Sequence, residues 1–253
     1  MDKIKITAVS YLNTKPLLYG ILQHPIEKSI DLSLDIPSIC AEKLRSGAAD
    51  VGLVPVAILP HLKNAQLISD FCIGSVGAVA TVCVFSQVPI DEIESIYLDY
   101  HSRTSVELLK ILLRNYWKIN PLLLPSSAGY EQKIVGTTAA LIIGDRAIGL
   151  EKQYPYVYDL GAAWTEMTQL PFVFAAWVSC KPLGTRFLQQ FNQALKNGIE
   201  HIPQLTYLLP SPHPDFNLNY YYTHNISYHL DTAKKEGLKL FLSYIKNEKL
   251  VVS

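Results

Sequence analysis

The sequence predicts an α/β protein whose chain forms two lobes with a cleft between them. Segments typical of buried strands alternate with amphipathic helical segments, an order that favours layered α/β architecture with mostly parallel strands. Two continuous apolar runs, 79–86 and 171–178, have the pattern of strands buried on both faces, and no Gly/Ser-rich linker interrupts the chain. We therefore expect both runs to cross between the lobes, so that residues 1–84 plus 178–253 form lobe I and residues 85–177 form lobe II.

Lobe I is expected to begin with alternating strands and helices. Its expected elements are strands at 4–9, 31–37, 66–74 and 78–86, a strand starting at 49, and helices at 14–23 and 38–47. Ser38 is a candidate N-cap of the second helix and Gly47 its stop, because a glycine tolerates the left-handed backbone that often ends a helix. Pro16 suits the first turn of the first helix, where a missing N–H costs nothing.

The rest of the chain continues the pattern through lobe II and back to lobe I. The expected elements are strands at 95–100, 121–125, 139–144, 156–160 and 171–179, helices at 103–117 and 145–153, and terminal helical patterns at 185–199, 217–225 and 232–246. In an open α/β sheet, ligands bind at the carboxyl ends of strands, where helices begin. These junctions are therefore the places to look for a site.

Composition and charge narrow the class of protein. Apolar residues make up 49% of the 253 residues, enough for a packed core, and the 22 basic side chains balance the 22 acidic ones. A nucleic-acid partner needs a basic excess and a membrane span needs a longer apolar run, so we expect neither. The amino terminus lacks the uninterrupted apolar run of a secretory signal, which predicts a cytoplasmic protein. The oligomeric state is left open.

The cysteine and histidine patterns indicate neither a metal nor a cofactor. The four cysteines are scattered among apolar neighbours without CxxC spacing, which is typical of buried, reduced thiols; they are Cys40, Cys72, Cys83 and Cys180. The seven histidines show no ligand spacing on one helix face. The sequence also contains no HExxH, GxSxG, GxxxxGK[ST] or GxGxxG motif.

The first candidate site lies where the first strand ends at Val9 and a helix begins. Ser10, Asn13 and Thr14 place hydroxyl and amide groups in that junction. A helix start offers free N–H groups and a partial positive charge, so the junction suits an anion. Ordinary helix capping by the same residue types is the competing interpretation.

A second junction, in lobe II, repeats this arrangement. Ser102, Thr104 and Ser105 stand at the start of the helix that follows strand 95–100, and Arg103 adds a guanidinium group suited to a carboxylate. Capping, with Arg103 in solvent, is again the alternative. Two such helix starts, one in each lobe, suggest a small ligand with two anionic groups held between the lobes.

Three further positions are candidate site residues, and each could instead have a purely structural role. Gly144 ends a strand and permits close approach of a ligand to the backbone. Asp145 follows it and is more simply explained as a helix cap. Thr81 lies in the apolar run 79–86, and threonine is common in strands.

Several longer stretches of the sequence form an ordered series that covers nearly the whole chain. They are VSYLNTKPLLYGI (9–21), LDYHSRTSVELLKILL (98–113), ALIIGDRAI (140–148), YDLGAAWTEMTQLPFVFAAWV (158–178) and NISYHLDTAKKEGLKLFL (225–242). In this series the chain resembles the chorismate dehydratase family, which provides the first enzyme of the futalosine route to menaquinone. The resemblance implies a two-lobed type II periplasmic-binding-protein-like fold with an interlobe cleft, put to enzymatic use.

The resemblance also implies a reaction and a set of site residues. Chorismate dehydratase is a carbon–oxygen lyase, a hydro-lyase, that eliminates water from the dianion chorismate to give 3-[(1-carboxyvinyl)oxy]benzoate without a cofactor. Asn13 is expected to orient the leaving hydroxyl or a carboxylate, and Thr81 to stand where the family carries a functional serine. The expected substrate-binding residues are Ser10, Tyr11, Thr14, Ser38, Ser102, Arg103, Thr104, Ser105, Gly144 and Asp145.

One segment departs from the family pattern. The family has Asp-Gly-Pro-Val followed soon by Ser, whereas this chain has Val76-Gly77-Ala78-Val79, then Ala80 and Thr81. The hydroxyl is kept with an extra methyl group, but without the Asp and Pro the local turn is expected to change.

Two other functions remain open. The sister enzyme that forms 1,4-dihydroxy-6-naphthoate needs a larger pocket and a residue that deprotonates a carbon, and the SYLNTKPL stretch speaks against it. A non-catalytic cytoplasmic protein that binds a small anion is the second alternative, because a fold does not fix a function. Neither junction places an acid or base at an obvious reacting position, His101 being the nearest candidate. Our hypothesis is therefore that the substrate's own enolpyruvyl carboxylate takes the proton.

Overall fold

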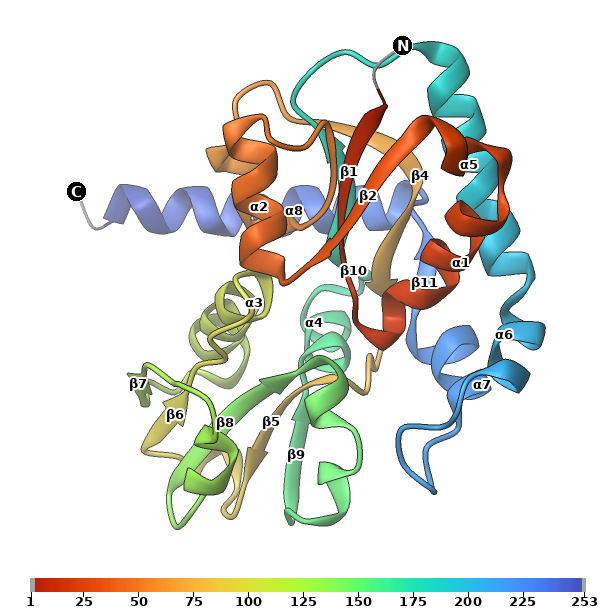
Figure 1. The fold of residues 1–253 in the computed structure, drawn as a ribbon. Coiled ribbons are helices and arrows are strands. Elements are labelled where there is room, and N and C mark those ends of the chain that lie inside the picture. Colours follow the sequence, from red (N-terminus) through yellow and green to blue (C-terminus); the bar gives the residue numbers. More distant parts are fainter. Residues whose placement is uncertain (1–2, 252–253) are drawn as a thin grey trace.

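Two β-sheets frame the molecule, one above the other in Figure 1. The structure, a computed structural model, describes the main chain of residues 3–251 and the side chains of residues 3–246. The first sheet has the strand order β11-β4-β10-β3-β1-β2, and the second has the order β7-β6-β8-β5-β9. The strands are β1 (Ile4–Val9), β2 (Ile30–Asp35), β3 (Val51–Pro55), β4 (Gln66–Ser75), β5 (Val82–Ser86), β6 (Ser95–Tyr97), β7 (Leu122–Leu124), β8 (Thr138–Ile143), β9 (Tyr156–Asp159), β10 (Phe172–Ser179) and β11 (Ser227–His229).

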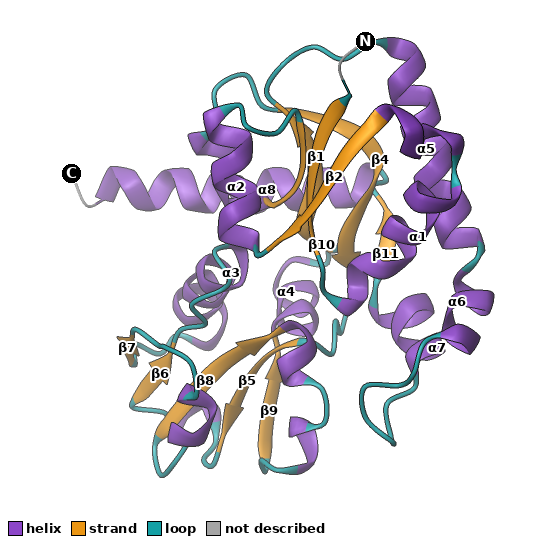
Figure 2. Ribbon diagram, in the orientation of Figure 1, coloured by secondary structure: helices purple, strands orange, loops and turns teal. Residues whose placement is uncertain are grey.

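Helices flank both sheets (Figure 2). They are α1 (Lys15–Gln23), α2 (Pro37–Ser46), α3 (Thr104–Leu112), α4 (Leu160–Thr168), α5 (Thr185–Glu200), α6 (Ile202–Leu208), α7 (Leu218–Tyr220) and α8 (Thr232–Val251). α2 packs on β1 and β3, α5 lies beside β4, and α8 contacts β10. α1 lies closely against α5, because Gly20 and Gly198 face each other: a Cβ at Gly198 would come within 2.0 Å of the Pro16 carbonyl oxygen.

The strand directions are mixed, in contrast to the mostly parallel sheets predicted from the sequence. β1 runs parallel to β2 and β3, and β6 runs parallel to β7 and β8. However, β10 is antiparallel to β3 and β4, and β5 is antiparallel to β8 and β9. The reason is topological: β5 and β10 both begin on the side of their sheet that faces the other sheet. As a result, the carboxyl ends of β1, β3, β4, β6 and β8 all face the space between the lobes.

The chain passes between the sheets through residues 76–81 and residues 160–171. β5 pairs only with β8 and β9, and β10 pairs only with β3 and β4, so each apolar run belongs to one sheet rather than crossing between the two. Their apolar character reflects a central position in the sheet. We propose lobe boundaries within these two segments. Residues 1–2 and 252–253 of the predicted lobe I lie outside the described residues.

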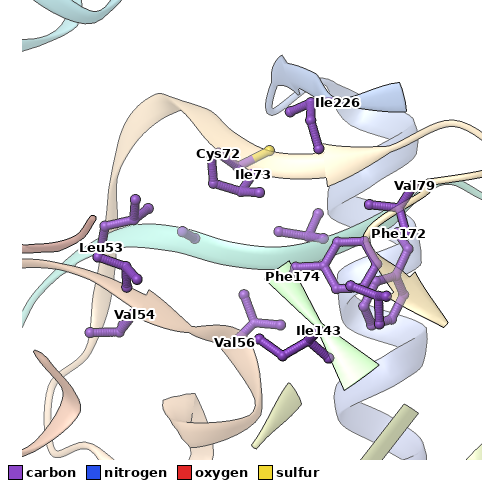
Figure 3. Close-up of a cluster of buried hydrophobic side chains, with 14 of the residues drawn as sticks. Leu53, Val54, Val56, Cys72, Ile73, Val79, Ile143, Phe172, Phe174 and Ile226 are labelled. Carbon is purple, nitrogen blue, oxygen red and sulfur yellow. The ribbon is translucent and has the colours of Figure 1, made fainter. Parts of the chain in front are cut away.

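A single hydrophobic cluster extends through the junction of the two sheets. Figure 3 shows Leu53 and Ile73 of the first sheet together with Phe174 of β10. Ile143, at the end of β8 in the second sheet, and Val79, in the first crossing segment, belong to the same cluster. Because this core is shared, apolar packing as well as chain connectivity holds the lobes together.

Local structure at α2 and after β8 differs from two predictions. The N-cap of α2 is Ile36, with Pro37 as the first helical residue, so Ser38 is not the cap; Gly47 ends the helix with φ of 76°, as expected. Residues 145–153 do not form an α-helix. Two short 3₁₀ turns span this region, because Gly149 adopts φ of 83° between them.

The terminal third of the chain is more irregular than its helical patterns suggest. The 217–225 pattern forms only α7 and a following π turn, Tyr221–Asn225. α4 and α6 were not predicted, because each is short and lies beside a stronger apolar or helical pattern. The four cysteines are free; three are buried, whereas Cys180 is only partly buried.

Candidate functional site

The carboxyl ends of strands from both sheets enclose a cavity of about 80 Å³ between the lobes. Predicted site residues from lobe I and the first crossing segment line one side of it: Tyr11, Asn13, Thr14 and Thr81. Predicted residues from lobe II line the other side: Ser102, Thr104, Ser105 and Gly144. The two junctions identified in the sequence therefore meet at one cavity. Apolar side chains, including Leu53, Ile73 and Phe174, complete its wall.

The junction after β1 does not use its polar side chains as helix caps. A 3₁₀ turn, Leu12–Thr14, leads directly into α1, and neither helix start has a side-chain cap hydrogen bond. Thr14 Oγ1 donates to Asn13 Oδ1 at 3.2 Å. This contact orients the Asn13 amide, because its oxygen is occupied and its two N–H donors stay available. Ordinary capping therefore does not account for Asn13 and Thr14.

Tyrosines from the C-terminal segment hold this junction by its main chain. Tyr222 donates its hydroxyl hydrogen to the Leu12 carbonyl at 3.0 Å, and Tyr228 donates to the Asn13 carbonyl at 2.9 Å. Tyr221 approaches the side chains instead: its hydroxyl lies 2.9 Å from Thr81 Oγ1. Buried tyrosines need partners for their hydroxyl groups, and here those partners are site residues.

The crossing segment that carries Thr81 is tied to the start of α4. The Asp159 carboxylate accepts hydrogen bonds from the N–H groups of Val79 and Ala80 at 3.1 and 2.7 Å, and also caps α4. Burial raises the pKa of Asp159, although these backbone hydrogen bonds oppose the shift. Thr165 Oγ1 also accepts the Gly77 N–H at 3.2 Å. The segment that departs from the family pattern is thus held from α4.

The start of α3 combines capping with a contact to lobe I. The N-cap residue of α3 is Arg103, whereas Ser102 Oγ, one residue earlier, accepts the Ser105 N–H at 3.0 Å and so satisfies one free N–H of the first turn. Thr104 is 2% exposed and its Oγ1 accepts the Ala57 N–H at 3.2 Å, which ties α3 to the segment after β3. Arg103 is exposed and does not line the cavity.

A buried ion pair supports the lobe II side of the cavity. The Asp99 side chain is fully buried and pairs with Arg146 at 2.5 Å. It also accepts hydrogen bonds from the His101 N–H, the Ile143 N–H and the Tyr130 hydroxyl. Asp99 therefore joins the loop before α3 to the end of β8. These are the two parts of lobe II that carry the predicted site residues.

Two polar contacts join the lobes at the rim of the cavity. The Leu12 N–H donates to Asp145 Oδ1 at 3.0 Å, and the Tyr11 hydroxyl lies 3.2 Å from His101 Nδ1. The prediction that Asp145 caps a helix is wrong, because its carboxylate is directed at the other lobe. Burial raises the pKa of Asp145, and the Leu12 N–H and Lys15 oppose this shift. Burial, with Asp99 next, raises the pKa of Tyr11 to about 12.

The cavity wall is largely apolar and carries polar groups without formal charge. Among the residues whose side chains the structure describes, its lining includes no Asp, Glu, Lys, Arg or His. An anion in this cavity would be held by hydroxyl, amide and backbone N–H groups, as at helix starts elsewhere. Ser10 and Ser38 are exposed and, like Arg103 and Asp145, lie outside the lining, so their part in binding stays a prediction.

Sequence patterns missed the residues that support the site. They are Asp99, Asp159, Tyr221, Tyr222 and Tyr228. The Tyr-Tyr-Tyr run at 220–222 was the signal available in the sequence. Three consecutive tyrosines are unusual on a solvated helix face, so they indicate buried hydroxyl groups that need partners.

Two α/β lobes with a cavity between them define a periplasmic-binding-protein-like fold. A solved protein of Archaeoglobus fulgidus superposes with a TM-score of 0.73 at 14% identity, covering 98% of both chains. The periplasmic aliphatic sulphonate binding protein of Escherichia coli superposes with a TM-score of 0.61 at 15% identity, covering 100% of this chain and 94% of that one. At these identities the likeness concerns the fold alone.

The sequence comparisons assign the chain to a family. Residues 4–247 match the family described as "Menaquinone biosynthesis", and the chain belongs to it. It is 28% identical to the chorismate dehydratase of Thermus thermophilus over 237 residues, covering 81% of this chain and 83% of that one. It is 33% identical to the chorismate dehydratase of Campylobacter jejuni over 127 residues, covering 48% and 56%. Among the described residues, no helix is long and apolar enough to cross a membrane.

Proposed function

We propose that this protein is a chorismate dehydratase, a hydro-lyase that converts chorismate to 3-[(1-carboxyvinyl)oxy]benzoate. The observation that carries the proposal is the meeting of the two predicted junctions at one uncharged interlobe cavity. Membership of the menaquinone biosynthesis family and the two chorismate dehydratase relatives support it.

The cavity suits the binding of a dianion. Chorismate carries a ring carboxylate and an enolpyruvyl carboxylate, and the two helix starts provide neutral hydrogen-bond donors on opposite walls. Ser105 and Thr104 are assigned to one carboxylate, and the junction around Thr14 to the other. Neutral donors stabilise negative charge without forming tight ion pairs that would hold the dianionic product.

The reaction removes the C3 proton and the C4 hydroxyl group, and the ring becomes aromatic. Asn13 and Thr81 are assigned to orient the leaving hydroxyl and the ring carboxylate, since both line the cavity. Among the described side chains, the lining offers no Asp, Glu or His as a base. This supports the hypothesis that the enolpyruvyl carboxylate of the substrate accepts the C3 proton, which then leaves with the hydroxyl group as water.

The same observation weighs against the first of the two alternatives. The enzyme that forms 1,4-dihydroxy-6-naphthoate needs a protein base at a carbon, and the lining described here lacks an ordinary one. A non-catalytic anion binder would need no particular amide or hydroxyl at the reacting position. Cytoplasmic location and the absence of a nucleic-acid partner stay predictions, which cell fractionation and a gel-shift assay would test.

Incubation of the purified protein with chorismate tests the proposal. We expect the cyclohexadiene absorbance to decay and the aromatic product to appear by chromatography in equal molar amount. Calorimetric titration with chorismate on the same preparation separates the alternatives. Binding without turnover would indicate a non-catalytic anion binder, and neither binding nor turnover by a folded protein would exclude the proposal.

A further inference from the structure

Tyr221 lies on a C-terminal segment that is pinned to the edge of the first sheet. A π turn begins at Tyr221, and the Ile226 N–H donates to the Tyr221 carbonyl at 2.9 Å. β11 follows at once and pairs antiparallel with β4. Because β4 leads directly into the crossing segment 76–81, this pairing brings Tyr221 beside Thr81. π turns of this kind are frequent at functional sites.

The hydroxyl of Tyr221 is buried behind the Thr81 side chain of the cavity wall. Tyr221 is 1% exposed, and its hydroxyl lies 2.9 Å from Thr81 Oγ1, which is itself 1% exposed. Burial raises the pKa of Tyr221, and hydrogen bonding with Thr81 and Asn13 opposes the shift without cancelling it. Tyr221 therefore stays protonated at neutral pH and has a hydrogen to donate.

The neighbouring tyrosines make a different kind of contact. Tyr222 and Tyr228 donate to the carbonyls of Leu12 and Asn13, so they support the main chain of the junction. Of these three tyrosines, Tyr221 is the one whose hydroxyl contacts a side chain that lines the cavity, that of Thr81. Tyr222 and Tyr228 therefore support the main chain of the junction, whereas Tyr221 is placed to orient a hydrogen-bond donor of the cavity wall.

We propose that Tyr221 is a positioning residue that directs the Thr81 hydroxyl and the Asn13 amide toward the bound substrate. Thr81 has one hydroxyl hydrogen, and when Tyr221 donates to its oxygen that hydrogen is left for a ligand. The Val79 carbonyl, at 3.5 Å, is a poor competing acceptor. Asn13 lines the cavity with Thr81, and hydrogen bonding with it lowers the pKa of Tyr221, opposing the effect of burial. The inference rests on the proposed function, because it assigns Tyr221 a place in that reaction.

Replacement of Tyr221 by phenylalanine tests this role against a matched control. Tyr221→Phe keeps the ring and removes the hydroxyl group; we expect kcat to fall by about tenfold or more, with KM changed by less than about threefold. Tyr154→Phe removes a tyrosine hydroxyl that donates to the Glu131 carbonyl at 3.2 Å, away from the cavity lining, and serves as the control. It should lower the melting temperature by a similar amount while leaving kcat within about threefold of wild type. Equal losses of kcat in the two variants would overturn the inference.

A double-mutant cycle examines the connection through Thr81. If Tyr221 acts by orienting the Thr81 hydroxyl, Tyr221→Phe should reduce kcat by a much smaller factor in a Thr81→Val background than in the wild type. Independent, multiplying effects of the two substitutions would contradict the proposal.

Crystal structures of the wild type and of Tyr221→Phe test the positioning role of Tyr221 without relying on the proposed reaction. If the wild type does not convert chorismate, the proposed function fails and the side-chain positions alone decide about Tyr221. A changed rotamer of Asn13 or Thr81 in the variant supports the positioning role. Unchanged positions of both side chains would overturn it, whatever reaction the protein catalyses.

Discussion

Asp145 of lobe II accepts the backbone N–H of Leu12 of lobe I, with 3.0 Å between nitrogen and oxygen. Leu12 lies between two residues of the cavity wall, Tyr11 and Asn13. The contact therefore fixes the first site junction to the end of β8, and the wall is complete only while the lobes are together. We expect this pair to act as a latch whose removal opens the cavity.

Asp145→Ala should weaken the closed arrangement. We expect KM for chorismate to rise by about fivefold, which corresponds to the loss of about 1 kcal/mol from one part-buried hydrogen bond at the rim. Small-angle X-ray scattering of the ligand-free variant should show a larger radius of gyration. Asp145→Asn keeps an acceptor oxygen and serves as the control. An unchanged radius together with an unchanged KM would show that Asp145 is no latch.

His101 should make stability depend on pH near neutrality. Burial and then Arg146 lower the pKa of His101, although Asp99 and Glu131 oppose them. In the unfolded chain the imidazole takes up its proton at about pH 6.5, so as the pH falls the unfolded state binds that proton first. The free energy of unfolding should therefore decrease between about pH 7 and about pH 5. His101→Gln should flatten this slope in urea titrations, and an identical slope would remove His101 as its source.

Asp159→Ala should loosen the crossing segment that carries Thr81. The substitution removes the acceptor of four backbone N–H groups, two of them in the segment itself, at Val79 and Ala80. We expect a loss of about 3 kcal/mol or more in unfolding free energy and faster hydrogen exchange at these two amides. Asp159→Asn retains one acceptor oxygen and should lie between the two. Exchange rates equal to the wild type would mean that the segment holds its shape without Asp159.

Asn13→Asp should impair turnover more than folding. Aspartate keeps the oxygen that accepts from Thr14 but replaces the amide donors with negative charge beside an anionic substrate. We expect kcat to fall by about a hundredfold, the scale seen when one transition-state donor is removed, with a nearly unchanged melting temperature. Asn219→Asp makes the same chemical change on the exposed face of α7 and is the control. Normal turnover by a stably folded Asn13→Asp protein would remove Asn13 from the site.

The site junctions could be predicted from the sequence because each is a local pattern. Asn13 and Thr14 lie between a strand and the helix that follows it, and Ser102 and Thr104 stand at the start of the corresponding helix in the other lobe. The carboxyl ends of strands face one another across an α/β cleft, so residues that are far apart in sequence could be brought together by rule. The same rule predicted where Gly144 would lie.

The supporting residues could not be predicted because their partners are distant in sequence. Thr81 and Tyr221 are 140 positions apart, and Asn13 and Tyr228 are 215 apart. No local periodicity links such pairs. Asp145 was misread for a related reason: capping is the common role of Asp after a strand, and only the closure of the lobes brings the Leu12 N–H to it.

The central position of β10 has a consequence for how the chain is synthesised. β10 lies between β3 and β4 and is their only link in the first sheet, yet it follows them by almost a hundred residues of intervening chain. On a ribosome, β1 to β4 must wait with an unfilled gap until residue 179 has emerged. All strands of the second sheet lie within residues 82–159 and can assemble before that. The lobe encoded in the middle is therefore the one expected to fold first. A fragment that ends before β10 would leave a three-stranded sheet of β3, β1 and β2 with an exposed edge, and β4 without a partner strand.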